Sequence, residues 1–276
     1  MRLLLFILCV NYVTCIEVSE YIKQLECTID EVDKIPDNLG PNGMPFIYKR
    51  GTEHLKELQT LLSIENLKII AGNTEIGVDY PGSMAPKTPA WRKTTLNDYI
   101  DNHVLKLQNM SIYEALESNI TRTYLWGPTD SNRLHDIEDD HNVKRHRTNF
   151  IPVDMYSKYK CPWKYKDIEL SIFGLAGKYT GLPFHKHAWG SNEVVYGKKL
   201  WLLYPPEEKI NTKNYTSIDM LFTMIEHYID DESFYQPQMC IQNPGDVINI
   251  PGNWNHMTFN LETTLMVGCV YVQEIN

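Results

Sequence analysis

Two features are missing from this sequence, and each absence narrows the class of protein. After the first fifteen residues, no apolar run reaches the roughly 20 residues that a membrane-spanning helix needs. The chain also lacks an excess of positive charge. It has 26 lysines and arginines but 35 aspartates and glutamates, which gives a formal charge of -9. A mildly acidic chain lacks the excess of basic residues that is typical of proteins that bind nucleic acid. The sequence therefore predicts neither a further transmembrane segment nor a nucleic-acid partner.

The first fifteen residues have the composition of a secretory signal peptide. Arg2 supplies a short positive region, Leu3 to Val10 form an apolar run, and small or modest side chains follow up to Cys15. The run is too short to span a bilayer, although a buried N-terminal strand or an uncleaved signal anchor would look similar. We expect residues 1–15 to be a cleaved signal peptide and 16–276 to be the mature chain.

Sequons and cysteines agree with an oxidising, glycosylating compartment. Asn-x-Ser/Thr acceptor sites occur at three asparagines in polar surroundings: Asn109, Asn119 and Asn214. The mature chain keeps four cysteines, which could pair in three ways or be small buried hydrophobes: Cys27, Cys161, Cys240 and Cys269. Because the secretory pathway is oxidising, we expect one or two disulfides.

The pattern of apolar residues changes along the mature chain. In the first part, about 16–168, helical spacing predicts helices over Glu53–Leu62 and Thr95–Leu107, while Leu67–Ala71 has the composition of a short strand. In the second part, about 169–273, short runs rich in Ile, Val, Leu and Tyr alternate with Gly and Pro, as in an all-β barrel or sandwich. The runs are Glu169–Ala176, Glu193–Tyr196, Leu200–Tyr204, Asp246–Ile250 and Leu265–Val272. We expect one domain, a barrel core with a helical flank.

The candidate chemistry lies in two short segments. His185 and His187 are two residues apart, so in a strand both side chains can project into a barrel interior. The second segment runs from Gly245 to Pro251 and leads to His256. His-x-His alone is explained by two surface histidines, but with the second segment it predicts that three imidazoles bind one metal ion at about 2.0–2.1 Å. The alternative is a packed polar cluster without metal.

These segments resemble the cupin motifs and, more closely, those of the JmjC family of iron(II)/2-oxoglutarate oxygenases. In that family His-x-Asp/Glu, Gly-x-Lys, Tyr/Phe-Pro-Pro and Trp-x-His follow one another on a double-stranded β-helix. The corresponding residues here are His185 and His187, Gly197 to Lys199, Tyr204 to Pro206, and Trp254 to His256. The resemblance implies a mainly β fold with flanking helices, of the double-stranded β-helix (jelly-roll/cupin, JmjC-type) kind.

The resemblance also assigns roles to individual residues. His185 and His256 match the two metal-binding histidines of the family. Lys199 matches the lysine that pairs with the distal carboxylate of 2-oxoglutarate, to which an ammonium offers a charged anchor, although Gly-Lys-Lys is also an ordinary turn into a strand. Asn192 lies where some members use an amide to touch the co-substrate. Iron(II) and 2-oxoglutarate are the implied cofactors, with another divalent metal as the alternative.

Two positions depart from the family's pattern. His187 stands where the family has an acidic metal ligand, and Leu182 stands where many members have a threonine that binds the co-substrate. A three-histidine site lacks the carboxylate of the usual oxygenase triad, and Glu193 is a nearby acid that could supply an oxygen ligand. These departures favour a non-catalytic or regulatory member that binds proteins, whereas Lys199 favours an Fe(II)/2-oxoglutarate-dependent protein hydroxylase.

The resemblance to a lumenal member of the family implies a location and a disulfide. It implies the endoplasmic reticulum lumen, or secretion, and a protein partner or protein substrate in the secretory pathway. We expect Cys27 to pair with Cys240, because Cys240 precedes the strand that delivers His256 and Cys27 lies in the N-terminal segment that must pack on the barrel. The sequence does not decide whether Cys161 pairs with Cys269.

Overall fold

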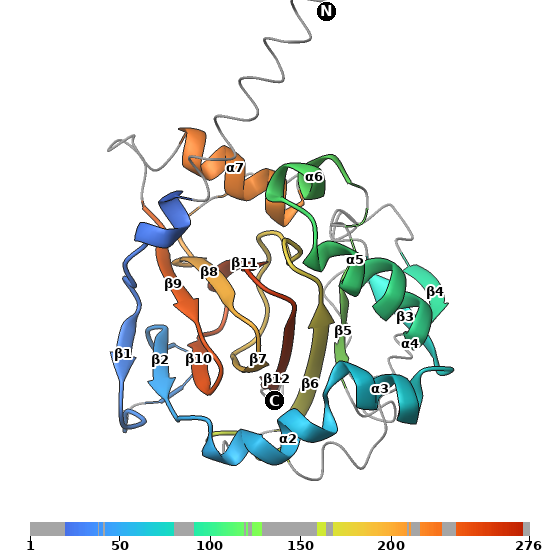
Figure 1. The fold of residues 1–276 in the computed structure, drawn as a ribbon. Coiled ribbons are helices and arrows are strands. Elements are labelled where there is room, and N and C mark those ends of the chain that lie inside the picture. The colour runs from blue at the N-terminus through green and yellow to red at the C-terminus, as the bar shows by residue number, and fades with distance from the viewer. Residues whose placement is uncertain are drawn as a thin grey trace, which may run out of the picture.

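Two β-sheets enclose the interior of the protein, and helices cover their outer faces (Figure 1). The structure is a computed structural model, and it describes residues 20–37, 39–40, 42–79, 91–118, 120, 123–128, 159–163, 168–208, 210, 216–227 and 236–272. The expected signal peptide and the sequons at Asn119 and Asn214 lie outside these residues. The mainly β fold with flanking helices that the sequence predicts is confirmed, and it is consistent with a jelly-roll of the JmjC type.

The larger sheet has seven strands in the order β1-β2-β10-β7-β12-β6-β5. All neighbours are antiparallel except β1 and β2. The strands are β1 Asp30–Val32, β2 Phe46–Lys49, β5 Leu125–Pro128, β6 Ile168–Ala176, β7 Gly190–Tyr196, β10 Asp246–Ile250 and β12 Thr264–Val272. Three of them come from the part of the chain expected to be a helical flank, so the sheet extends beyond residues 169–273.

The smaller sheet has three strands in the order β11-β8-β9. They are β8 Lys199–Tyr204, β9 Gln238–Gln242 and β11 Asn255–Asn260, and a separate hairpin pairs β3 Glu75–Asp79 with β4 Trp91–Thr95. The chain before His185 runs along the free edge of β11, because Thr258 N donates to Leu182 O at 3.0 Å and His256 N donates to His185 O at 2.9 Å. This irregular edge places the first histidine segment beside His256.

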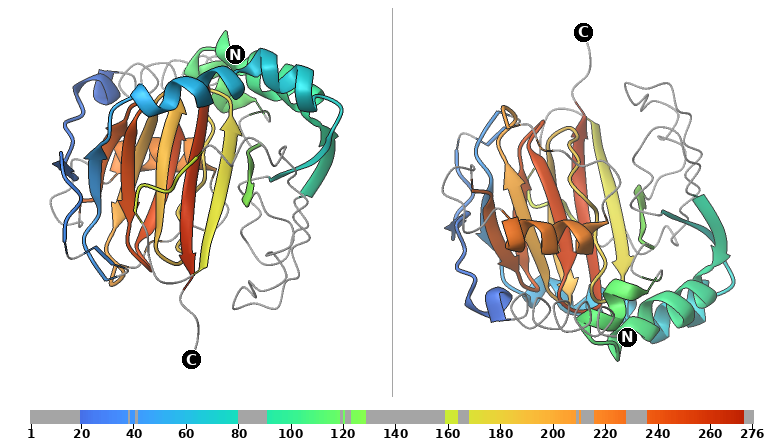
Figure 2. Two further views of the ribbon diagram at one scale, coloured as in Figure 1. Left: turned by 90° about the horizontal axis from the view of Figure 1, so that it is seen from below. Right: turned by 90° about the horizontal axis from the view of Figure 1, so that it is seen from above.

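Helices pack on both outer faces of the barrel (Figure 2). They are η1 Glu53–Leu55, α2 Lys56–Leu61, α3 Ile64–Ala71, α4 Leu96–Tyr99, η3 Ile100–Val104, α5 Leu105–Gln108, α6 Ile112–Glu117 and α7 Ser217–His227. Side chains of α2, α3 and α4 pack against the larger sheet, and those of α6 and α7 against the smaller. Within the described ranges, no helix combines the length and the apolar character that crossing a membrane requires.

The strand expected over Leu67–Ala71 is wrong, because these residues form the second half of α3. The Oγ of Ser63 accepts a hydrogen bond from the backbone N–H of Asn66 and caps the helix start. Leu67 and Ala71 are then four residues apart on one helical face, and both are buried. The local cap and this spacing outweigh the β propensity of the neighbouring isoleucines.

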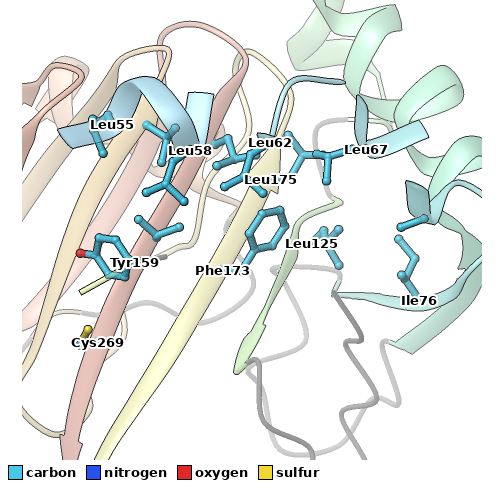
Figure 3. Close-up of a cluster of buried hydrophobic side chains, with 14 of the residues drawn as sticks. Leu55, Leu58, Leu62, Leu67, Ile76, Leu125, Tyr159, Phe173, Leu175 and Cys269 are labelled. Atoms are coloured by element: carbon cyan, nitrogen blue, oxygen red, sulfur yellow. The ribbon is translucent and has the colours of Figure 1, made fainter. Parts of the chain in front are cut away.

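Alternation along β12 decides which side chains face the helices and which face the interior. Leu265, Val267 and Cys269 join the apolar cluster under α2 and α3, together with Leu58 of α2 (Figure 3). The intervening side chain of Met266 lines the interior pocket. The larger sheet therefore has one face that stabilises the fold and one face that forms the site.

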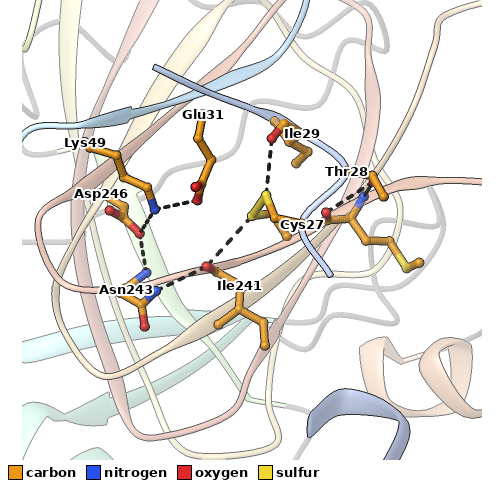
Figure 4. Close-up of a disulfide and its surroundings, with 10 residues drawn as sticks. Cys27, Thr28, Ile29, Glu31, Lys49, Ile241, Asn243 and Asp246 are labelled. Atoms are coloured by element: carbon orange, nitrogen blue, oxygen red, sulfur yellow. Dashed lines mark hydrogen bonds and ion pairs between the residues drawn. A yellow bond between two sulfur atoms is a disulfide. The ribbon is translucent and has the colours of Figure 1, made fainter. Parts of the chain in front are cut away.

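Two disulfides fasten earlier segments of the chain to the barrel. Cys27 and Cys240 are joined with a Cα–Cα distance of 4.3 Å, so the pairing expected from the sequence is present (Figure 4). Beside it, Thr28 N donates to Met239 O at 2.8 Å, which holds the N-terminal segment on β9. The second disulfide, which the sequence left undecided, joins Cys161 to Cys269 at a Cα–Cα distance of 6.0 Å.

Candidate metal centre

Three histidines converge inside the barrel. The ring centroid of His256, on β11, lies 4.2 Å from that of His185 and 4.7 Å from that of His187. One ring nitrogen of each lies within 4.8 Å of the other two. The convergence that the sequence predicts is therefore present, although neither histidine lies in a regular strand: His185 forms an isolated bridge with His256, and His187 lies in the irregular segment before β7.

A main-chain carbonyl fixes the orientation of each of the three rings. The Nδ1 of His185 is 2.8 Å from Pro183 O, the Nδ1 of His256 is 2.9 Å from Trp254 O, and the Nδ1 of His187 is bonded to the carbonyl of Ala188. Because a carbonyl only accepts, each Nδ1 carries the proton in the neutral ring, and the lone pair is on Nε2. This is the tautomer that binds a metal through Nε2, with the other nitrogen fixed by an outer partner.

Burial favours the neutral form of two of the rings. Desolvation lowers the pKa of His256 well below its ordinary value, and the neighbouring rings of His185 and His187 lower it further. Desolvation also lowers the pKa of His187. Neutral imidazoles whose Nδ1 atoms are bonded to carbonyls leave Nε2 to bind a divalent ion, such as zinc, iron or copper, that accepts nitrogen ligands.

A buried lysine shares the pocket with the histidines. The pocket is lined by residues of both sheets. The side chain of Lys199 is 1% exposed, and its Nζ donates to the Oη of Tyr124 at 3.1 Å. In the described part of the chain no carboxylate pairs with it, and desolvation lowers the pKa of Lys199 to about 7. The pocket thus offers a cation that lacks a counter-ion, which suits an anionic ligand.

Asn192 and Glu193 face opposite sides of β7. Asn192 lines the pocket, where its Nδ2 donates to Met266 Sδ and its buried Oδ1 has no hydrogen-bond partner. Glu193 points to the outer face, where its fully buried carboxylate lies 2.9 Å from Arg50 Nη1 and 2.6 Å from His54 Nε2. The idea that Glu193 supplies an oxygen ligand to the metal is therefore wrong.

Comparison with known proteins agrees with this geometry, although no family model matches the chain. JmjC domain-containing protein 8 of Mus musculus is 37% identical over 95 residues, which are 34% of this chain and 35% of that protein. The 2-oxoglutarate and iron-dependent oxygenase JMJD4 of Danio rerio is 26% identical over 150 residues, 49% of this chain and 34% of that protein. These curated homologues support a JmjC-domain family for the chain. Its matches span about a third of the length of these curated relatives.

The departures from the JmjC pattern lie within the pocket. His187 occupies the place of the acidic ligand, and Leu182 forms an apolar wall with Tyr124 and Ala176 where many JmjC members have a threonine. Tyr124 was not among the predicted site residues, because it lies far from the histidines in the chain and belongs to none of the sequence motifs. Tyr124 directly precedes β5, which Tyr99 links to β6. The Oη of Tyr99 accepts from Leu125 N at 3.1 Å and donates to Leu175 O at 2.8 Å.

The remaining sequence-predicted site residue in the described part is Asn109, which is exposed directly after α5. A glycan attached to this side chain would project into solvent, away from the buried histidines. Glycosylation at Asn109 stays a prediction.

Replacing the buried lysine is expected to stabilise the protein in a pH-dependent way. The pKa of Lys199 falls from 10.5 to about 7 on folding, so burying its charged form costs up to about 5 kcal/mol at about 1.4 kcal/mol per tenfold change. Below pH 7 the full cost applies. As the pH rises from 7 towards 10.5, the unfolded state binds more protons than the folded state, so wild-type stability rises.

We therefore expect the stability gain of Lys199→Met over the wild type to be larger at about pH 6 than at about pH 9, by roughly 2–3 kcal/mol, as measured by denaturant unfolding. Lys198→Met is the matched control, because Lys198 is exposed and pairs with Glu262 at 3.4 Å. An equal gain for Lys199→Met at both pH values would show that the buried ammonium is not its source.

Proposed function

We propose that this chain is a metal-binding JmjC-type cupin that acts as a non-catalytic or regulatory module on a protein partner. The observation that carries the proposal is that three histidine side chains could hold one metal ion, while no carboxylate lines the pocket in the described residues. Iron(II) oxygenases of this type combine two histidines with one carboxylate. Glu193, which could have restored the triad, is held on the outer face by Arg50 and His54.

We place this function in the endoplasmic reticulum lumen or outside the cell. The expected signal peptide and the three sequons support this location. The two disulfides support it as well, because such bonds persist in oxidising compartments. The acidic net charge favours a protein partner over nucleic acid.

The second candidate is an Fe(II)/2-oxoglutarate-dependent protein hydroxylase, and one observation favours it. Lys199 and Tyr124 form a buried donor pair in the histidine pocket, which fits a carboxylate of 2-oxoglutarate. His185, His187 and His256 would then hold iron(II), which supplies the oxygen chemistry when bound. Leu182 opposes this candidate, because it removes a hydroxyl donor from the wall of the pocket.

Succinate formation separates the two candidates. The purified mature chain is incubated with iron(II) and 2-oxoglutarate, with His185→Ala as the control. We expect no succinate above the control. Metal-dependent succinate from the wild type that disappears in His256→Ala would contradict the non-catalytic proposal and establish the hydroxylase chemistry.

Restoring the missing carboxylate is expected to strengthen iron binding. In His187→Asp the added charge offsets one charge of the divalent ion, so the affinity for iron(II) should rise by roughly tenfold or more. His187→Asn is the matched control, because its amide has nearly the same shape without the charge. Both affinities are measured by anaerobic titration. Equal iron(II) affinities for the Asp and Asn variants would show that residue 187 does not contact the metal.

A further inference from the structure

Residues 159–163 form a short segment, the strap, that packs on the outer face of the larger sheet, the face opposite the histidine pocket. The disulfide of Cys161 to Cys269 of β12 fixes the middle of the strap (Figure 3 labels Cys269 and Tyr159). Arg50 Nη1 donates to the carbonyl of Lys160 at 3.4 Å, and Tyr271 Oη donates to the carbonyl of Trp163 at 3.1 Å. The covalent bond is the strongest of these attachments.

A stack of buried aromatic rings connects the strap to the start of β7. The indole of Trp163 is nearly parallel to that of Trp189, with ring centroids 6.5 Å apart, and Trp189 lies 4.4 Å from the ring of Tyr271. Trp189 Nε1 donates to Asn249 Oδ1 at 2.7 Å, and Trp189 O accepts from Tyr271 N at 2.9 Å. Trp189 is therefore held by contacts with two aromatic rings, by a side-chain hydrogen bond and by a backbone hydrogen bond.

Trp189 in turn fixes the partner of one metal-binding histidine. The carbonyl that orients the ring of His187 belongs to Ala188, and Ala188 is exposed, so its own side chain anchors nothing. Its position depends on its two neighbours in the chain, Trp189 and His187, whose carbonyl accepts from Asn253 N at 3.0 Å. His185 and His256 are oriented by the carbonyls of Pro183 and Trp254, which are not attached to the strap.

We propose that Trp189 is a positioning residue for His187 and that the Cys161–Cys269 disulfide holds Trp189 in place through Trp163. The orientation of His187 then depends on the redox state of this disulfide. A dithiol reductant attacks the partly exposed Cys161, supplies two electrons and two protons, and becomes a disulfide, while Cys161 and Cys269 become thiols. The strap is then held only by non-covalent contacts. The inference rests on the proposed metal site for its effect on metal affinity, but not for its effect on the ring.

The test reads the histidine ring directly, in metal-free protein labelled with ¹⁵N-histidine at about pH 8, where imidazole is neutral. In the wild type, NMR of the ring nitrogens should show His187 locked with its proton on Nδ1. In Cys161→Ser/Cys269→Ser and in Trp163→Ala, His187 should become a mixture of both tautomers. The signals of His185 and His256 should stay unchanged, which also shows that each variant is folded.

Two controls separate positioning from general destabilisation. Trp163→Phe keeps an aromatic ring over Trp189 and should restore the His187 tautomer. Cys27→Ser/Cys240→Ser removes the other disulfide and should leave His187 locked. An unchanged His187 tautomer in both strap variants overturns the inference, and so does an equal loss of the lock in the Cys27→Ser/Cys240→Ser control.

Zinc affinity of the same proteins supplies the second readout. It should fall by about 10- to 100-fold in the strap variants, the usual effect of losing an outer partner of a metal ligand. In a His187→Ala background the strap variants should lower it no further, and a further loss there would contradict the inference. If the wild type binds no zinc or other divalent ion, the proposed metal site is wrong, while the NMR result still decides the inference.

Discussion

Replacing His256 by alanine is expected to lower the affinity for zinc or iron(II) by more than about 100-fold. Loss of an outer partner alone costs about 10- to 100-fold, and this substitution removes a ligand. His256 is the most buried of the three rings, and its centroid lies within 4.7 Å of both others. Competition with a chelator of known affinity measures the effect.

His54→Ala is the matched control for this substitution. His54 is a histidine of the same chain, but its Nε2 lies against Glu193 on the outer face of the sheet. We expect the control to bind metal as the wild type does. Wild-type affinity in His256→Ala, or an equal loss in His54→Ala, would show that the metal binds elsewhere.

Removing the Cys27–Cys240 disulfide is expected to cost about 5 kcal/mol of unfolding free energy in the chain-entropy model. The two cysteines are 213 residues apart, so the bond closes a loop that spans most of the chain. Typical domains are stable by about 5–15 kcal/mol, so a loss of this size is a large part of the total stability but leaves a domain in the upper part of that range folded. Denaturant unfolding of Cys27→Ser/Cys240→Ser without reductant measures it.

The second disulfide gives an internal comparison. Cys161 and Cys269 are 108 residues apart, so the same model predicts a slightly smaller loss for Cys161→Ser/Cys269→Ser. A loss below about 1 kcal/mol for the Cys27 and Cys240 variant would contradict the account, because the N-terminal segment would then be held on the barrel without its covalent bond.

Much of the site could be predicted because its residues belong to short segments with a fixed spacing. His185, His187 and His256 flank predicted strands, and a barrel leaves few places where the ends of those strands can meet. Lys199 was assigned to the site by the family resemblance, and the structure places it at the start of β8, where it lines the pocket together with Trp201. Periodicity found the strands for the same reason, since a buried face imposes alternation.

Other features depend on contacts that no local pattern encodes. Glu193 follows Asn192 directly, and only the register of β7 decides which of the two faces the pocket. Tyr124 reaches Lys199 because Tyr99 bridges β5 and β6. The strands β1, β2 and β5 are only three or four residues long, too short for a periodic pattern, and they form by pairing in the larger sheet.

X-ray absorption at the metal edge of zinc-loaded protein tests the three-histidine site most directly. The account predicts a first shell of nitrogen at about 2.0–2.1 Å with the outer-shell scattering of three imidazoles. His187→Ala should reduce that scattering to two imidazoles, and His54→Ala should leave it unchanged. A shell with sulfur ligands, or with one imidazole or none, in the wild type would contradict the assignment of the metal to His185, His187 and His256.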